Sequence, residues 1–207
     1  GNYTGIIRFT MGEINNLKFN HITINAPKVS YSAPIASDRS ISVRNISLND
    51  ITVSGNSYVA GFIARTRNFD MTYLDFSDVS VSGTGNYISG LIGYRDYSSR
   101  STIFHITGQD ITVKGGSYVG SVFGYGGADQ VSVSNVTISG GNYVGGINGI
   151  SVVDYIYDNT VTDSYISSTG DYLGGITGYT RNLYRSFLIG STVEGTSTNS
   201  SYLGGIA

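Results

Sequence analysis

Short runs in which apolar and polar residues alternate recur along this chain at a nearly constant interval. One run begins at a tyrosine, as in Tyr143–Gly149, whose sequence is Tyr-Val-Gly-Gly-Ile-Asn-Gly. Recognisable copies begin at tyrosines 3, 31, 58, 87, 118, 143, 172 and 202, so successive copies lie 25 to 31 residues apart. Because a fixed period of this length is typical of solenoids, the spacing predicts stacked repeats.

A second run lies upstream of each tyrosine, with apolar residues separated by one or two polar ones. In one copy its apolar positions are Val43, Ile46, Leu48, Ile51 and Val53. Alternation over short runs rich in β-branched residues predicts strands, and no window shows a sustained helical pattern. We expect three short strands per repeat, which in the third repeat lie at about 58–64, 71–76 and 79–81.

These patterns predict an all-β fold, a parallel β-helix of about seven to eight coils with about 28 residues in each coil. Right-handed winding is the common hand for such helices and is expected here. Residues 1–207 would form one repeat domain. The chain begins close to one repeat tyrosine and ends inside the eighth copy, so we expect a fragment of a longer chain or a unit that stacks end to end.

The tyrosine run also predicts which side chains face the interior. The second, fourth and sixth residues after the tyrosine are small, apolar and small, as in Ala60, Phe62 and Ala64. The fifth position holds Arg8, Asn148 and Thr177 in three copies. Because successive side chains of a strand point to opposite faces, we expect the fifth position to face solvent. The repeat tyrosines should stack as a ladder near a corner of the coil.

Composition narrows the function classes. The formal net charge of −2 offers no basic field for nucleic acid, and no apolar run approaches the length needed to span a bilayer. Cysteine is absent, which excludes disulfides and thiolate metal sites. No cofactor motif is present, so we expect neither a cofactor nor a metal.

The tyrosine run resembles the GLUG motif, a short glycine-aliphatic-x-glycine repeat of secreted and surface bacterial proteins. Residues 90–93 (Gly-Leu-Ile-Gly) match it, and residues 146–149 and 175–178 nearly do. The chain is also similar to the non-catalytic β-helical region of streptococcal IgA1-protease-type zinc metalloproteases. The resemblance implies an extracellular or cell-surface location. A His-Glu-x-x-His zinc motif is absent from the sequence, so the resemblance implies a stalk and not a catalytic domain.

An acidic column precedes the last strand of the second run. It consists of Asp50, Asp78, Asp110, Asn135 and Asp163. Stacked carboxylates could hold calcium or act as an acid–base pair, as in β-helical polysaccharide lyases and hydrolases. The simpler interpretation is that Asp and Asn are favoured where a strand begins after a corner. Because the column repeats in most coils, we favour the simpler interpretation.

Tyrosines and arginines outside the repeat pattern are the candidate binding residues, because these two residue types often anchor binding surfaces. They are expected along one flank of the rod. The candidates are Tyr94, Tyr97, Tyr125, Tyr179, Arg95, Arg100 and Arg181.

The sequence therefore favours a non-enzymatic β-helical stalk or adhesion segment of a bacterial surface or secreted protein. Its expected partner is a host or bacterial glycan or protein, without nucleic-acid binding or membrane insertion. Two alternatives remain open. One is a polysaccharide lyase or hydrolase that uses the stacked Asp residues, and the other is a fibre subunit that associates end to end.

Overall fold

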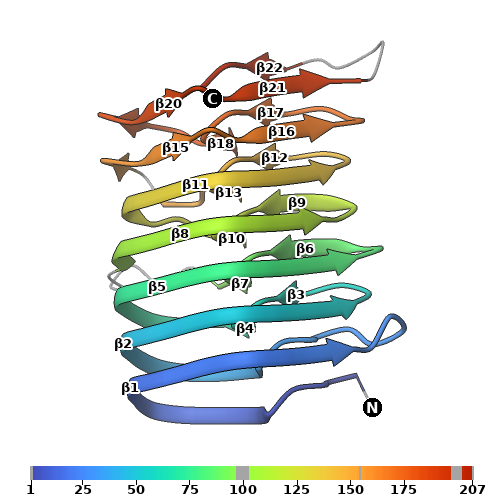
Figure 1. Cartoon of the computed structure of the whole chain (residues 1–207), viewed down its shortest axis with the longest axis vertical. Helices are drawn as coiled ribbons and strands as arrows, with labels where there is room; N and C mark the ends of the chain where they lie inside the picture. Colours follow the sequence, from blue (N-terminus) through green and yellow to red (C-terminus); the bar gives the residue numbers. More distant parts are fainter. Residues whose placement is uncertain (1, 97–102, 154, 197–201, 207) are drawn as a thin grey trace.

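The computed structural model describes residues 2–96, 103–153, 155–196 and 202–206. In these residues the chain forms strands and connections without a helix, and every strand pairing is parallel. The strands wind as coils stacked along one axis, with the N-terminal and C-terminal coils at opposite ends of the rod (Figure 1). The predicted parallel β-helix is confirmed.

Three sets of strands repeat from coil to coil. The longest strands form the broad face seen in front in Figure 1: β1 (Ile7–Asn25), β2 (Ile35–Gly55), β5 (Asn68–Gly83), β8 (Ile103–Lys114) and β11 (Asp129–Gly140), continued by the shorter β15 (Thr160–Thr162), β16 (Tyr165–Ser168), β20 (Phe187–Ile189) and β21 (Thr192–Gly195). The strands after the repeat tyrosines are β3 (Val59–Ala60), β6 (Asn86–Ser89), β9 (Ser117–Gly120), β12 (Val144–Gly145), β17 (Leu173–Gly174) and β22 (Leu203–Gly204). The returning strands are β4 (Ile63–Thr66), β7 (Ile92–Arg95), β10 (Phe123–Tyr125), β13 (Asn148–Ile150) and β18 (Thr177–Tyr179), and a small pair is formed by β14 (Ile156–Tyr157) and β19 (Leu183–Tyr184).

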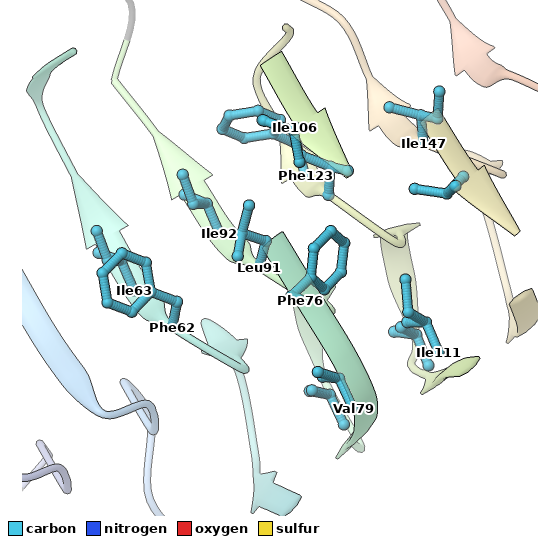
Figure 2. Close-up of a cluster of buried hydrophobic side chains, with 14 of the residues drawn as sticks. Phe62, Ile63, Phe76, Val79, Leu91, Ile92, Ile106, Ile111, Phe123 and Ile147 are labelled. Atoms are coloured by element: carbon cyan, nitrogen blue, oxygen red, sulfur yellow. The ribbon is translucent and has the colours of Figure 1, made fainter. Parts of the chain in front are cut away.

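The register places equivalent residues of successive coils over one another. Ile51 pairs with Val79, Val79 with Ile111, and Ile111 with Val136. Each of these residues is almost fully buried, in a core that runs through the stack (Figure 2). Sequence columns are therefore physical columns, with neighbours one strand spacing of about 4.8 Å apart.

Left-handed backbone at two corners explains the spacing of the broad-face strands. In β8 the residues His105 and Asp110 have positive φ, and at each of them two consecutive residues point outward before inward alternation resumes. The buried positions are consequently Ile103, Ile106, Gly108, Ile111 and Val113. Each corner thus corresponds to a place in the sequence where two consecutive outward-facing residues, instead of one, separate the buried apolar positions.

The strand that starts at the repeat tyrosine differs from the prediction. The chain bends at Gly61 and Phe62, between β3 and β4, so Phe62 and Ile63 both face the core (Figure 2). The equivalent bends of later coils bury the fifth position after the tyrosine, where Asn148 and Thr177 are fully buried, whereas Arg8 of the first coil is exposed. The expectation that this position faces solvent is wrong for Asn148 and Thr177, because the bend shifts the phase of alternation, and it holds for Arg8.

Two glycines of the tyrosine run are required by close backbone approach. A Cβ at Gly90 would lie 2.3 Å from the Ser121 carbonyl oxygen of the next coil. A Cβ at Gly93 would lie 2.8 Å from the Tyr87 carbonyl oxygen, where the returning strand passes the tyrosine corner. Glycine at these positions lets the coils stack and lets the chain fold back tightly.

Candidate functional site

The eight repeat tyrosines stack ring upon ring along one corner of the rod, which confirms the predicted ladder. Centroids of consecutive rings lie between 4.5 and 5.0 Å apart, and the planes differ by 3° to 25°. We call this set the tyrosine ladder; its members are Tyr3, Tyr31, Tyr58, Tyr87, Tyr118, Tyr143, Tyr172 and Tyr202.

The ladder tyrosines from Tyr31 to Tyr172 have left-handed backbone, with φ between 51° and 65°. This conformation is unfavourable for a bulky side chain, by about 1–2 kcal/mol. The corner holds because stacked rings stabilise it, and because Ala33, Ala60 and Ala64 pack beneath Tyr31 and Tyr58. The ladder is thus a structural element that also presents a continuous aromatic edge.

A second column runs beside the ladder, at the end of the returning strands. We call it the flanking column; its residues in register are Arg65, Tyr94, Tyr125, Ile150 and Tyr179. The rings of Tyr94 and Tyr125 stack with centroids 4.9 Å apart. They meet the ladder edge to face, and the Tyr87–Tyr94 centroids are 5.0 Å apart with planes at 81°.

Charged groups close the lower end of the flanking column. Arg65 lies over the Tyr94 ring at 5.5 Å, and its Nη2 donates to the Asp96 carboxylate at 3.1 Å. Arg67 approaches the same carboxylate at 3.3 Å. Burial raises the pKa of the Tyr94 hydroxyl, and its hydrogen bond to Asp96 and the negative charge there raise it further. Tyr94 therefore stays protonated at neutral pH.

A groove opens where the flanking column holds Ile150. We call it the Ile150 slot; it has a volume of about 760 Å³ and is lined by Tyr125, Tyr143, Ile150, Ser151, Val152, Tyr172, Tyr179 and Arg181. Tyr125 and Tyr179 lie on the coils below and above Ile150. Tyr143 and Tyr172 belong to the ladder, so the slot lies between the two columns.

The structure gathers three of the sequence candidates, Tyr125, Tyr179 and Arg181, around this slot. Tyr94 lies in the same flanking column, one coil below Tyr125. Tyr97 and Arg100 lie outside the described residues.

Arg95 does not lie on the exposed flank. Its neighbour Tyr94 points outward, so alternation turns Arg95 inward, and the side chain is only 2% exposed. The Arg95 guanidinium donates from Nη1 to the Gly127 carbonyl oxygen at 3.1 Å. The placement of Arg95 on the exposed flank is corrected accordingly, because side-chain direction and not sequence proximity decides which residues share a surface.

Sequence reasoning missed Ile150 and the part that ladder tyrosines play as walls of the slot. A signal was present, since the residue after the last glycine of the tyrosine run is Tyr94, Tyr125 and Tyr179 in three copies but Ile150 in one. The meaning of Ile150 in this series became clear only from the structure, which shows that these four residues are stacked in register.

The acidic column follows the left-handed corner. Asp50, Asp78, Asp110, Asn135 and Asp163 all have positive φ, between 48° and 56°. Asp and Asn adopt this conformation more readily than most residues, and the same corner is occupied by His21 in the first coil and Gly190 in the last. His21 Nδ1 lies 2.6 Å from the Asp50 carboxylate, and Asn135 donates to Asp110. Backbone conformation thus accounts for the column.

Two further observations concern the described residues alone. No cluster of three or more His, Cys, Asp or Glu side chains suited to a metal ion occurs among them. They also contain no helix that is long and apolar enough to cross a membrane.

No protein-family model matches this chain, and no curated protein matches it. Among solved structures, the chain is similar to a "putative immunoglobulin A1 protease" from Bacteroides ovatus, with 15% sequence identity and a TM-score of 0.47. The match covers 93% of this chain and 64% of that chain, so this chain spans less than two thirds of that protein. A similarity at this level carries no information about ligand or activity, and the GLUG resemblance stays a prediction.

Proposed function

We propose that this β-helix is a non-enzymatic stalk and adhesion segment of a bacterial surface or secreted protein, and that its flank of tyrosines binds a glycan. The observation that carries the proposal is the Ile150 slot, which brings four tyrosines and Arg181 to one groove. Concave sites with apolar walls and a few polar groups are typical of ligand binding. The resemblance of the tyrosine run to surface repeats supports the location.

The mechanism is passive. Parallel stacking of the coils fixes the spacing of the ladder and the flanking column, so the aromatic surface is formed before a ligand arrives. A site built on strands loses little conformational entropy on binding. The acidic column supports the non-enzymatic assignment, because it follows a corner that recurs in nearly every coil instead of marking one special coil.

A binding screen tests the proposal. The purified chain would be applied to an array of bacterial and host glycans, with immobilised extracellular-matrix proteins as a second arm. We expect glycan binding that Tyr179→Ala weakens. Binding to proteins alone, or glycan binding that ignores this substitution, would contradict the proposal.

A parallel assay addresses catalysis. Soluble polysaccharides incubated with the chain, with and without calcium, should show no new reducing ends and no unsaturated products. If products appear and Asp110→Asn abolishes them, the chain is an enzyme that uses the acidic column.

A further inference from the structure

The flanking column lacks an aromatic ring at Ile150, between Tyr125 and Tyr179. Tyr94 and Tyr125 occupy neighbouring rungs and stack directly, with centroids 4.9 Å apart. Ile150 occupies the next rung and Tyr179 the one after it. The aliphatic side chain of Ile150 is shorter than a tyrosine, and the slot opens at this rung. The slot is therefore a vacancy between two aromatic residues of the column, Tyr125 and Tyr179.

The dimensions of the vacancy follow from the strand spacing. Tyr125 and Tyr179 start from backbone positions two rungs apart, which corresponds to about 10 Å. A stacked ring in this column needs one rung, as the Tyr94–Tyr125 pair shows. The space between Tyr125 and Tyr179 thus suits a group one ring thick. The ladder rings of Tyr143 and Tyr172 line the slot as well.

The chemistry of the lining favours a sugar ring over a purely apolar one. The walls are aromatic rings, while tyrosine hydroxyls, Ser151 and Arg181 supply polar groups. Burial and the neighbouring ladder tyrosines raise the pKa of Tyr172, so its hydroxyl remains a hydrogen-bond donor at neutral pH. A pyranose ring matches this lining, because its faces carry C–H groups that pack on aromatic rings and its edge carries hydroxyls.

We propose that the Ile150 slot binds one pyranose ring of a glycan, which takes the position of the missing tyrosine ring between Tyr125 and Tyr179. The inference rests on the proposed function and deepens it by naming the subsite and the size of its occupant. Below the slot the flanking column is closed to such a ring, because Tyr94 stacks on Tyr125 and Arg65 covers the other face of that stack.

The decisive variant is Ile150→Tyr, which adds the missing ring and removes none of the other lining groups. Tyrosine is already accommodated at the equivalent positions Tyr94, Tyr125 and Tyr179. Thr137→Tyr is the matched control, since Thr137 is exposed on the broad face and its neighbour in register is Tyr165. Each variant adds one tyrosine, but only one fills the slot.

Binding would be followed by saturation-transfer NMR with methyl glycosides of glucose, galactose, mannose and N-acetylglucosamine, and with N-acetyltyrosinamide as an aromatic probe. We expect at least one glycoside to receive saturation from the wild type and from Thr137→Tyr, with no transfer from Ile150→Tyr. Tyr179→Ala removes one wall and should weaken binding roughly tenfold, as loss of a stacking contact does. If Ile150→Tyr fails to fold, Tyr179→Ala and Tyr125→Ala decide the question.

The outcomes separate this inference from the proposed function. Glycosides could still bind to Ile150→Tyr and Tyr179→Ala but no longer bind to Tyr94→Ala. That result would contradict binding in the Ile150 slot, while the proposal of a glycan-binding flank would stand. If N-acetyltyrosinamide binds and none of the glycosides does, the occupant of the slot is a protein side chain. That result would contradict the proposal of a pyranose ring. If no probe binds and the glycan array is also silent, the proposed function fails together with the slot.

Discussion

The ring of Tyr118 stacks on the ring of Tyr143 with centroids 5.0 Å apart and planes that differ by only 3°. Both residues have left-handed backbone, with φ of 60° and 57°. A favourable side-chain contact and an unfavourable backbone conformation therefore belong to the same residues. Ring stacking offsets the free-energy cost of the left-handed backbone. A single substitution at such a tyrosine can therefore change both the stacking and the backbone cost.

Tyr118 tests this balance, because its ring stacks on both Tyr87 and Tyr143. Tyr118→Ala loses both contacts and keeps the unfavourable backbone, so we expect a loss of roughly 2–4 kcal/mol in unfolding free energy. Tyr118→Gly loses the same contacts but relieves the backbone, so it should be less damaging by about 1 kcal/mol. Chemical denaturation measures both, with Tyr118→Phe as a near-neutral control. An alanine variant more stable than the glycine variant would argue against the balance.

The acidic column gives a second test of backbone conformation. Asp78 has φ of 52°, and the same corner of the last coil is occupied by Gly190. We expect Asp78→Gly to change stability little, whereas Asp78→Val should lose about 1–2 kcal/mol because a β-branched residue is disfavoured there. Thermal melting of the two variants checks this. Equal losses would indicate that the carboxylate itself stabilises the coil.

Core packing around Gly108 depends on Phe76 in the neighbouring coil. The two residues are paired in register, and a Cβ at Gly108 would lie 2.4 Å from Cε1 of the Phe76 ring. Gly108→Val should therefore overpack the core and cost about 1–3 kcal/mol. Combining it with Phe76→Val should recover part of that loss, so the double variant should be more stable than the sum of the single effects. Strictly additive effects would show that the ring does not fill this space.

Asn148 is fully buried, and neither atom of its amide has a hydrogen-bond partner in the part of the chain that the structure describes. It occupies a core column with Phe123 below and Thr177 above. Because an unsatisfied buried amide is costly, Asn148→Val should raise the unfolding free energy by roughly 1–3 kcal/mol. Thr177→Val is the control, since its hydroxyl donates to the Tyr179 carbonyl oxygen and its removal should bring no such gain. A destabilised Asn148→Val would imply that the amide is satisfied in solution.

Alkaline pH should lower the free energy of unfolding of the β-helix. Burial first, and nearby tyrosines or Asp96 next, raise the pKa of Tyr58, Tyr87 and Tyr94 above the ordinary value of 10.0. The unfolded chain then loses tyrosine protons at a pH where the folded chain keeps them, so stability is retained below pH 10 and falls as pH rises beyond it. Circular-dichroism melting across this range measures the slope. Tyr94→Phe removes one titrating group and should flatten the slope, and an unchanged slope would contradict this assignment.

The sequence by itself determined the solenoid, the ladder and the corner at the acidic column. A fixed interval between tyrosines implies stacking in register, because residues one coil apart become neighbours, as Tyr58 and Tyr87 do. The Asp or Asn before the last strand of the second run marked one corner, as at Asp110. The left-handed corner at His105 was not predicted, since the equivalent Tyr73 lies inside the strand expected at 71–76. These features recur in successive repeats, so they can be recognised by comparing the repeats within the sequence.

Only the tertiary structure decided which face each residue of the returning strand presents. The bend at residues 90–91 shifts the phase of alternation and turns Arg95 inward, and the equivalent bend at residues 146–147 buries Asn148. The Ile150 slot likewise exists only because two columns from different strands lie side by side. A bend and the approach of two columns are set by packing across the coil, and the order of residues along one strand does not encode them locally.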